Sequence, residues 1–373
     1  MIDIQISVQI FKIRYPAEIL CCTKKRFNDF YSHLHTCMAT VNNDITQHIF
    51  KVEAEGFEQT ALDIFRYQHE HNAIYRRYCD ALKINAEEIM GLGQIPFLPI
   101  SFFKTKEVTT TSFTPQAIFE SSGTTGSINS RHFVKDVSVY EESFLKTFSR
   151  FYGDVNECCI IGLLPSYMER KNSSLVYMVN ELVKKSTKHN SGFYLYDFKK
   201  LHHTLLANEK IKQRTLLIGV TYALLDFAEQ YKMNLKYTTV METGGMKGRR
   251  VEITREEVHQ KLQQQLGIAA VHSEYGMTEL LSQAYSSANG IFTCPPWMKI
   301  LIRAEDDPFE ITVAQNITKA YASGAINIID LANIYSCSFI ATDDMGILYS
   351  NENFEIIGRL DNSDMRGCGL MIV

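Results

Sequence analysis

The sequence has 373 residues, of which 45% are hydrophobic and 21% are charged, and its net charge is −4. This length leaves room for about two domains with a large core, and the composition is that of a globular protein. The slightly acidic balance argues against a nucleic-acid surface, no apolar run reaches the length of a membrane span, and nine cysteines without a C-x-x-C pair indicate neither a zinc ribbon nor a disulfide framework.

Residues 1–100 are expected to form a mostly helical N-terminal segment. The segment lacks the charged start and apolar block of a signal peptide, so we expect a cytoplasmic protein with reduced thiols. From Phe57 to Leu82 the apolar residues recur at the spacing of one helical face. Pro96 and Pro99 then end the helical pattern and force an extended crossing, so we place the boundary with the main body at residues 93–104.

A short stretch that combines hydroxyl side chains with glycines follows. It reads Ser121-Ser122-Gly123-Thr124-Thr125-Gly126. Glycines let backbone N–H groups approach phosphate oxygens, and hydroxyls donate further hydrogen bonds. Apolar residues on both sides indicate that the stretch links two strands. It is not a Walker loop, and the alternative interpretation is an ordinary polar hairpin.

From residue 110 onward, apolar runs alternate with helical patterns. Strands are expected at Glu157–Leu164, Ser191–Tyr196, Thr215–Val220, Thr238–Glu242 and Ile268–His272, and helices at Ser173–Lys185, Tyr222–Lys232 and Thr254–Gln265. Thr254 and Glu257 have the spacing of a capping box. The alternation predicts a parallel, doubly wound sheet with helices on both faces, in which ligands bind at the carboxyl ends of the strands.

Two of the loops that follow these strands carry candidate binding residues. Thr243-Gly244-Gly245 follows one strand, and its paired glycines permit a flat ligand to lie against the backbone. Ser273–Glu279 follows another strand and brings an aromatic ring, a glycine, a hydroxyl and a carboxylate to one strand end. The alternative is a glycine turn in which Thr278 only caps a following helix.

Beyond residue 290 the sequence becomes rich in strand patterns. Strands are expected at Trp297–Arg303, Gly324–Asp330, Ser338–Thr342 and Ile347–Tyr349. Asp343-Asp344-Met345-Gly346 has the composition of a hairpin turn between the last two. We therefore expect an α/β main body with a smaller, β-rich C-terminal portion.

Taken in chain order, these stretches resemble the motifs of the adenylate-forming enzymes. Ser121–Gly126 resembles their phosphate loop, Thr243–Gly245 their adenine-side glycines, and Tyr275–Glu279 their Tyr-Gly-x-Thr-Glu motif. Thr342–Asp344 stands where they carry Thr-Gly-Asp, and Gly358–Asp361 where they carry the hinge Gly-Arg-x-Asp. The acyl-protein synthetase (LuxE-like) branch is more similar still, over most of the chain, including Pro96–Lys104, Glu242–Lys247, Cys294–Trp297, Ile329–Asn333 and Arg366–Cys368.

The resemblance implies a fold like the N-terminal domain of the adenylate-forming enzymes, with an activating body at 101–360 and a short arm at 361–373. It also implies a binding role for each motif residue. ATP phosphates would be held by Ser122, Gly123, Thr124, Thr125 and Gly126, adenine by Gly244, Gly245 and Tyr275, and the ribose by Asp344 and Arg359. Thr278 would contact the α-phosphate, and Glu279 would bind Mg²⁺.

Two departures from the family pattern concern cations. Adenylate-forming enzymes usually continue the phosphate loop with Pro-Lys-Gly, whereas this sequence continues Ile128–Arg131, so Arg131 is the candidate replacement for that lysine. Most relatives carry a further domain after the hinge, which supplies a second lysine. Because the sequence ends at Val373, we expect that domain to be truncated and its lysine to be replaced by another cation of this chain or of a partner.

The activity implied by the resemblance is ATP-dependent activation of a fatty acid to an acyl-adenylate, followed by transfer of the acyl group to a protein thiol. Cys368, close to Arg366, is the expected acceptor, because a neighbouring cation favours the thiolate. Apolar faces around residues 215–245 are candidates for the acyl-chain pocket. The expected partners are a fatty acid and a fatty-acid reductase, acyltransferase or carrier protein. The alternatives are a carboxylate–CoA ligase and a non-catalytic nucleotide or acyl sensor.

Overall fold

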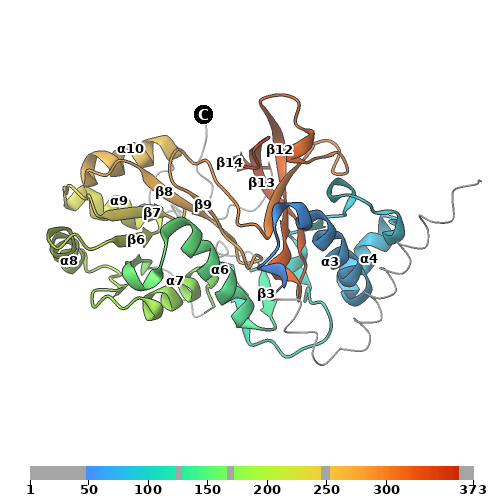
Figure 1. Cartoon of the computed structure of the whole chain (residues 1–373), viewed down its shortest axis with the longest axis horizontal. Helices are drawn as coiled ribbons and strands as arrows, with labels where there is room; N and C mark the ends of the chain where they lie inside the picture. Colours follow the sequence, from blue (N-terminus) through green and yellow to red (C-terminus); the bar gives the residue numbers. More distant parts are fainter. Residues whose placement is uncertain (1–47, 122–127, 166–171, 245–252, 361–373) are drawn as a thin grey trace, which may run out of the picture. The chain divides into compact units, whose positions relative to one another are not determined.

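The computed structural model describes residues 48–121, 128–165, 172–244 and 253–360. The described residues from Ile49 onward form one compact unit, and all the elements below lie in it. Two six-stranded sheets make up its centre (Figure 1). Within the described ranges, no helix combines the length and the apolar character needed to cross a bilayer.

The first sheet is mostly parallel, as the alternating pattern predicts. Its strand order is β5-β4-β6-β7-β8-β9, and only the β8–β9 pair is antiparallel. The strands are β4 (Cys159–Leu163), β5 (Gly192–Phe193), β6 (Thr215–Gly219), β7 (Thr238–Glu242), β8 (Val271–Tyr275) and β9 (Ala284–Ser286). Every residue of β4 and β6 is buried, which is typical of parallel strands covered on both faces.

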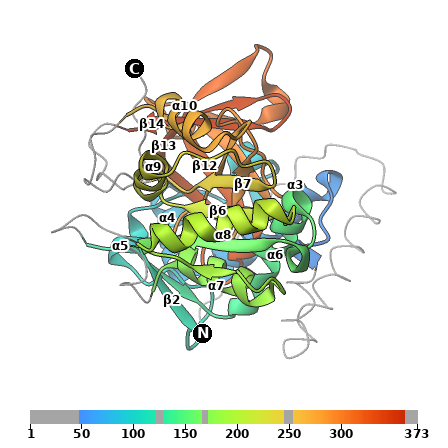
Figure 2. The same cartoon turned by 90° about the vertical axis from the view of Figure 1, so that its left-hand side faces the viewer.

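Helices cover both faces of this sheet. They are α6 (Val137–Tyr152), α7 (Ser174–Lys185), α8 (Phe198–Lys210), α9 (Thr221–Gln230) and α10 (Arg255–Leu266). In Figures 1 and 2, α9 and α10 lie on one side of the strands and α7 lies on the other, with α6 beside it in Figure 1. The predicted capping box at the start of α10 is present, with Thr254 and Glu257 each accepting the backbone N–H of the other. The doubly wound α/β architecture is thereby confirmed.

The order of the parallel strands changes direction between β4 and β6. In chain order the five parallel strands run second, first, third, fourth and fifth across the sheet. In such sheets the crevice at the point of reversal, outside the carboxyl ends of the strands, is the usual ligand site. The loops that follow β6, β7 and β8 all reach this edge, because these strands are parallel.

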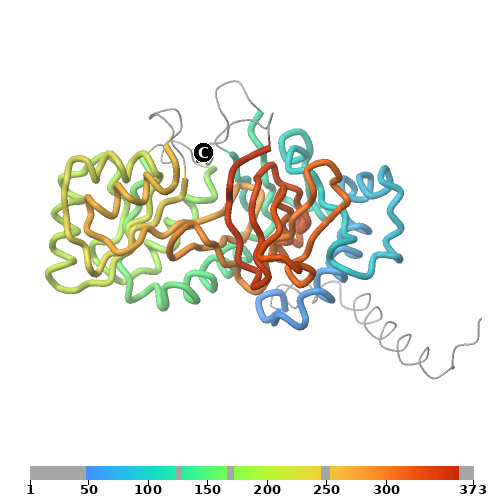
Figure 3. The backbone as a smooth tube through the Cα atoms, turned by 90° about the horizontal axis from the view of Figure 1, so that it is seen from above, coloured from blue at the N-terminus to red at the C-terminus, as the bar shows by residue number. Residues whose placement is uncertain are grey.

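The second sheet is built around two long antiparallel strands. Its members are β1 (Leu98–Pro99), β10 (Met298–Arg303), β11 (Ile311–Thr312), β12 (Tyr321–Asp330), β13 (Phe339–Tyr349) and β14 (Phe354–Arg359). Strands β12, β13 and β14 lie side by side, coloured orange to red in Figure 3. Strand β1 pairs with β13 in parallel, so the proline-rich segment is extended, as predicted.

The hairpin predicted between Ser338–Thr342 and Ile347–Tyr349 is wrong. Strand β13 continues through Asp343–Gly346 without a turn. The glycine that gives Asp343–Gly346 a turn-like composition has another role. Gly346 lies directly opposite Gly324 of β12, where the two strands pair. The predicted β-rich C-terminal portion is nevertheless present.

A separate two-stranded hairpin carries the hydroxyl-rich stretch. Its strands are β2 (Ala117–Glu120) and β3 (Arg131–Val134), and they pair in antiparallel fashion. The prediction that this stretch links two strands is confirmed. Residues 122–127 lie outside the described residues.

The N-terminal helices are α3 (Phe57–His71), α4 (Ala73–Ala81) and the single turn α5 (Phe102–Thr105). The continuous helical pattern is interrupted at Asn72, whose side chain accepts the N–H groups of Ile74 and Tyr75 and begins α4. Short 3₁₀ turns lie at Ala54–Gly56, Ala86–Glu88, Leu92–Gln94, Val155–Glu157, Ala314–Asn316 and Leu331–Asn333.

Helix α3 is bound to the connection between β12 and β13 by one buried amide. Gln68 Nε2 donates to the carbonyl oxygens of Asn333 and Ile334, each at 3.0 Å, and Gln68 Oε1 accepts the N–H of Ser338 at 2.9 Å. Tyr75 of α4 stacks on Phe339 with ring centroids 6.0 Å apart. The helices of residues 57–81 therefore pack in the same compact unit as the second sheet.

Replacing Gln68 by Ala should destabilise the folded chain by roughly 1–3 kcal/mol, because buried backbone groups lose their partner. Urea unfolding would measure the loss. Gln59 on the same helix is the matched control, since its amide is exposed and bonds to the side chain of Asp63. An equal effect of Gln59→Ala and Gln68→Ala would contradict the anchoring role of Gln68.

Candidate functional site

Three residues from the predicted binding motifs are in direct contact. Tyr275 ends β8, Asp344 lies within β13 and Arg359 ends β14. The Tyr275 hydroxyl donates to Asp344 Oδ2 at 2.9 Å, and Arg359 Nε donates to Asp344 Oδ1 at 3.1 Å. Asp344 and Arg359 are also register partners in the β13–β14 ladder. The cluster thus joins the two sheets at the carboxyl end of β8.

The surroundings of Tyr275 fix the direction of these bonds. Its ring packs against Phe292 and Phe354, with centroids 5.9 and 5.5 Å away. Burial, together with the negative charge of Asp344, raises the pKa of Tyr275 well above its usual range, so the phenol remains a donor. Each Asp344 oxygen has a second lone pair, which leaves the carboxylate able to accept hydroxyl groups of a ligand.

The Thr278–Glu279 segment is held from two sides. His132 of β3 donates from Nδ1 to the Thr278 carbonyl at 2.9 Å, and burial lowers the pKa of His132 to about 4, so the ring is neutral. Asn333 Nδ2 donates to the Glu279 carbonyl at 2.8 Å, and the Glu279 side chain is buried. The chain then turns directly into β9. The interpretation of Thr278 as the cap of a following helix is therefore wrong.

The next residues of the same loop are bound by Asp330, the last residue of β12. Asp330 Oδ2 accepts the N–H groups of Leu281 and Ser282 at 2.8 and 3.0 Å, and Oδ1 accepts the Ser282 hydroxyl at 2.6 Å. Ser282 also bonds to Ser143 of α6 at 3.0 Å. Burial raises the pKa of Asp330 to about 6, an effect that these donors oppose.

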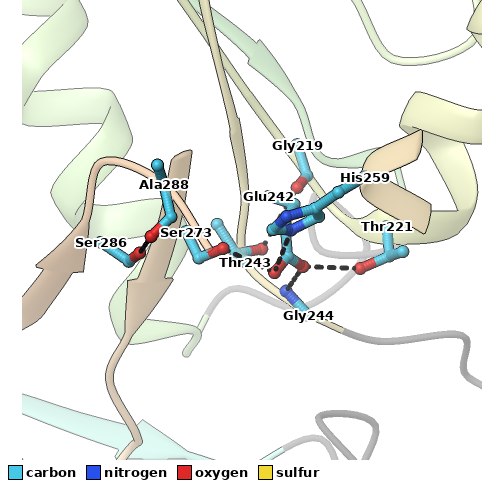
Figure 4. A network of polar contacts seen from close by, with 9 residues as sticks. All are labelled: Gly219, Thr221, Glu242, Thr243, Gly244, His259, Ser273, Ser286 and Ala288. Carbon is cyan, nitrogen blue, oxygen red and sulfur yellow. Dashed lines mark hydrogen bonds and ion pairs between the residues drawn. The ribbon is translucent and has the colours of Figure 1, made fainter. Parts of the chain in front are cut away.

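The expected strand at Ile268–His272 is shifted, since β8 begins at Val271 and ends at Tyr275. Ser273 and Glu274 therefore lie within the strand and point to opposite faces of the sheet. The Ser273 hydroxyl donates to Glu242 Oε1 at 2.9 Å (Figure 4).

Glu274 is a carboxyl in an unfavourable position for charge. Burial, and then the negative charge of Glu242, raise its pKa to about 8, so it is protonated at neutral pH. A Cβ atom at Gly276 would come within 2.4 Å of Glu274 Oε1. Gly276 therefore leaves the space that the folded-back Glu274 side chain fills.

The remaining predicted residues are distributed as follows. Gly244 follows β7 and has a left-handed backbone with φ of 74°, which favours glycine. Arg131 is exposed at the start of β3, with its guanidinium 5.3 Å from the centroid of the Phe133 ring. Seven predicted site residues lie outside the described residues: Ser122, Gly123, Thr124, Thr125, Gly126, Gly245 and Cys368.

The sequence reasoning assigned no role to His132, Asp330 or Glu242. His132 bonds to Thr278 and Asp330 to Ser282, which are 146 and 48 residues away, so spacing alone does not reveal these roles. Glu242 bonds to the nearby Gly244 but also to Ser273, 31 residues away. Asp330 and Glu242 do lie in segments that carry the family resemblance, and Glu242 directly precedes the Thr-Gly-Gly stretch. Their place in these segments is the sequence feature that marks Asp330 and Glu242 as candidates.

A cavity of about 540 Å³ is lined by residues other than those of this cluster. Its lining includes Phe50–Ala54, Thr293–Leu301 and Asn351–Asn353. Neither Tyr275, Asp344 and Arg359 nor the apolar faces around residues 215–245 contribute to it. In the described parts of the chain, no group of three or more His, Cys, Asp or Glu side chains is placed to hold a metal ion.

Comparisons with known proteins agree with the motif pattern. A family model described as "Acyl-protein synthetase, LuxE" matches residues 50–373. A "Long-chain-fatty-acid--luciferin-component ligase" from Vibrio harveyi is 23% identical over 341 residues, covering 82% of this chain and 84% of the relative. A protein of the same name from Photorhabdus luminescens is 37% identical over 70 residues, covering 18% of this chain and 60% of the relative.

Solved structures share less with this chain. A long-chain-fatty-acid–CoA ligase from Archaeoglobus fulgidus matches with a TM-score of 0.45 and 14% identity, over 65% of this chain and 51% of that one. The match therefore spans about half the length of that protein.

Glu274→Gln should flatten the pH dependence of stability. The folded-state pKa of about 8 lies above the ordinary value of 4.5, so the folded protein retains a proton that the unfolded chain releases. This favours folding at low pH, and the contribution is lost as the pH rises from about 4.5 to about 8. Urea unfolding at about pH 5 and about pH 8.5 should show a larger fall in unfolding free energy for the wild type than for Glu274→Gln. Equal falls would contradict the raised pKa.

Proposed function

The chain belongs to the acyl-protein synthetase (LuxE) family, and from this premise we propose that it is an ATP-dependent ligase that activates a fatty acid and passes the acyl group to a protein thiol. The observation that carries the proposal is the contact of Tyr275, Asp344 and Arg359 at the carboxyl end of β8. Three motifs separated along the chain meet there, at the edge of the sheet where ligands usually bind. The names of the two curated relatives support a fatty acid as the substrate.

In this proposal the nucleoside lies between the Gly244 turn and Tyr275. The positive φ of Gly244 and its missing side chain leave backbone open to a flat base. Asp344 accepts the ribose hydroxyls, for which its oxygens have free lone pairs, and Arg359 holds Asp344 in place. The phosphates extend toward the hydroxyl-rich stretch between β2 and β3, with Arg131 as the nearby cation.

Glu279 is the proposed ligand of Mg²⁺. The chemistry fits, because Mg²⁺ in such sites is bound by one or two carboxylates, substrate phosphates and water, and needs no larger cluster of side chains. When bound, Mg²⁺ neutralises negative charge on the phosphates that would repel an attacking carboxylate. The bonds from His132 and Asn333 to the neighbouring carbonyls hold the Thr278–Glu279 backbone in a fixed position.

The reaction proceeds in two steps. A carboxylate oxygen of the fatty acid attacks the α-phosphorus of ATP, a new P–O bond forms, and pyrophosphate leaves with the electrons of the bond that breaks. A thiolate then attacks the acyl carbon, forming a thioester and releasing AMP. Cys368 is the proposed thiol.

Glu279→Gln should reduce fatty-acid-dependent ATP–pyrophosphate exchange by roughly tenfold or more, because an amide supplies no charge to Mg²⁺ and one lost charged contact is worth about 1.5–3 kcal/mol. Exchange of labelled pyrophosphate into ATP measures the first step alone. Glu88→Gln is the control, since Glu88 lies in the turn Ala86–Glu88, outside the site. Exchange at the wild-type rate in Glu279→Gln would remove this residue from the proposed metal site.

Cys368→Ala should retain pyrophosphate exchange and lose all hydroxylamine-labile acyl label on the protein. The first step needs no thiol, whereas the second step forms a thioester on this sulfur. Incubation with labelled fatty acid, ATP and Mg²⁺, followed by gel analysis with and without hydroxylamine, measures the label. Equal labelling of wild type and Cys368→Ala would refute Cys368 as the acceptor, and preferred discharge to free coenzyme A would favour a CoA ligase.

A further inference from the structure

Glu242, the last residue of β7, has a carboxylate whose two oxygens both accept hydrogen bonds. It is 3% exposed. Oε2 accepts the Gly244 N–H at 2.8 Å and the Thr221 hydroxyl at 2.9 Å, and Oε1 accepts the Ser273 hydroxyl at 2.9 Å (Figure 4). The donors are the first residue of α9, the turn after β7 and the central residue of β8. One carboxylate therefore joins these three segments.

The carboxylate bonds directly to the glycine turn. The Gly244 N–H points to Glu242, and this bond supports the left-handed backbone conformation of Gly244, with φ of 74°. Two further bonds hold the same turn to the end of β6: Thr243 N donates to Gly219 O at 3.0 Å, and Thr221 N donates to Gly244 O at 3.4 Å. Glu242 is the one charged member of this set.

Two residues of α10, Arg255 and His259, lie near the carboxylate. His259 Nε2 is 3.8 Å from Glu242 Oε1. Burial opposes the charge of Glu242, but His259, Arg255 and the Gly244 N–H more than offset it and lower the pKa to about 2. The carboxylate is thus ionised at neutral pH, and hydrogen bonds to an ionised acceptor are roughly twice as strong as those between neutral groups.

We propose that Glu242 is a positioning residue that sets the Thr243–Gly244 turn for the nucleoside end of ATP. The inference rests on the proposed function, since it takes the turn as the place where the base lies. It assigns Glu242 no contact with the ligand. Its hydrogen bond holds the Gly244 backbone in one conformation, so less conformational entropy is lost when a ligand binds to the turn.

The direct test is Glu242→Ala, which removes the acceptor of the Gly244 N–H. Equilibrium dialysis should show ATP binding weakened by about tenfold to a hundredfold, the equivalent of one charge-assisted hydrogen bond. Inorganic tripolyphosphate carries the phosphates without the nucleoside, so its competition against ATP reports on the other end of the site. The affinity of Glu242→Ala for tripolyphosphate should stay within about twofold of the wild-type value. General loss of structure would weaken the binding of both ligands, so it would not produce this difference.

Glu209→Ala is the matched control. Glu209 accepts the N–H groups of Lys236 and Tyr237 and the hydroxyl of Thr238, so it makes the same kinds of bond at the amino end of the same strand. Its loss should leave ATP affinity unchanged. If Glu242→Ala does not fold, Glu242→Asp takes its place, because it keeps the charge but withdraws the carboxylate from Gly244 by one methylene.

Each outcome separates this inference from the proposed function. A wild-type chain that binds no ATP refutes the proposed function, and the role of Glu242 with it. A wild type that binds ATP, with a folded Glu242 variant that binds it within about twofold as tightly, refutes only the positioning role. Equal weakening of ATP and tripolyphosphate would also refute it, since the effect would then extend beyond the nucleoside end.

Discussion

The geometry of the candidate site depends on how the two sheets hold the loop between β8 and β9. Asp330 at the end of β12 accepts three donors from Leu281 and Ser282, all inside the buried core. A buried donor without an acceptor costs more free energy than a completed hydrogen bond contributes to stability. The loop is therefore stable only in the position that places these donors on Asp330. Asn333 and His132 then fix the carbonyls of Glu279 and Thr278 in the same loop. The loop is thereby preorganised from opposite sides.

Three residues of the site lie on strands rather than on loops. Tyr275 is the terminal residue of a strand, and Asp344 and Arg359 are paired across a ladder. Their side chains therefore have little freedom to move apart. Rigid elements hold functional groups more accurately than loops do, which is what recognition of a sugar hydroxyl requires.

Sequence reasoning located the elements whose signals are local. Strand β7 has the predicted bounds, and the Thr254–Glu257 capping box needs only residues three apart. The assignment of Tyr275, Asp344 and Arg359 to one nucleotide site was predicted from family resemblance, not from their spacing along the chain. The predicted hairpin failed because a turn composition and a close strand contact look alike: a Cβ at Gly346 would come within 2.5 Å of Ile326. Asp330 and His132 have partners in distant segments, so sequence patterns did not identify them. Glu242 bonds to Gly244 only two residues on, but no local motif marks a carboxylate in that role.

The bond between Gln68 and Ser338 joins residues 270 positions apart, and β1 pairs with Ile340 and Ala341 of β13. On a ribosome that adds about 5–20 residues per second, the partners of α3 appear roughly 15–50 s after α3 itself. Tyr75 of α4 follows at once and packs against Phe65, with ring centroids 6.1 Å apart. Phe339 of β13 contacts the same ring, also at 6.1 Å. Part of the apolar face of α3 therefore stays without its native partner until β13 has been synthesised.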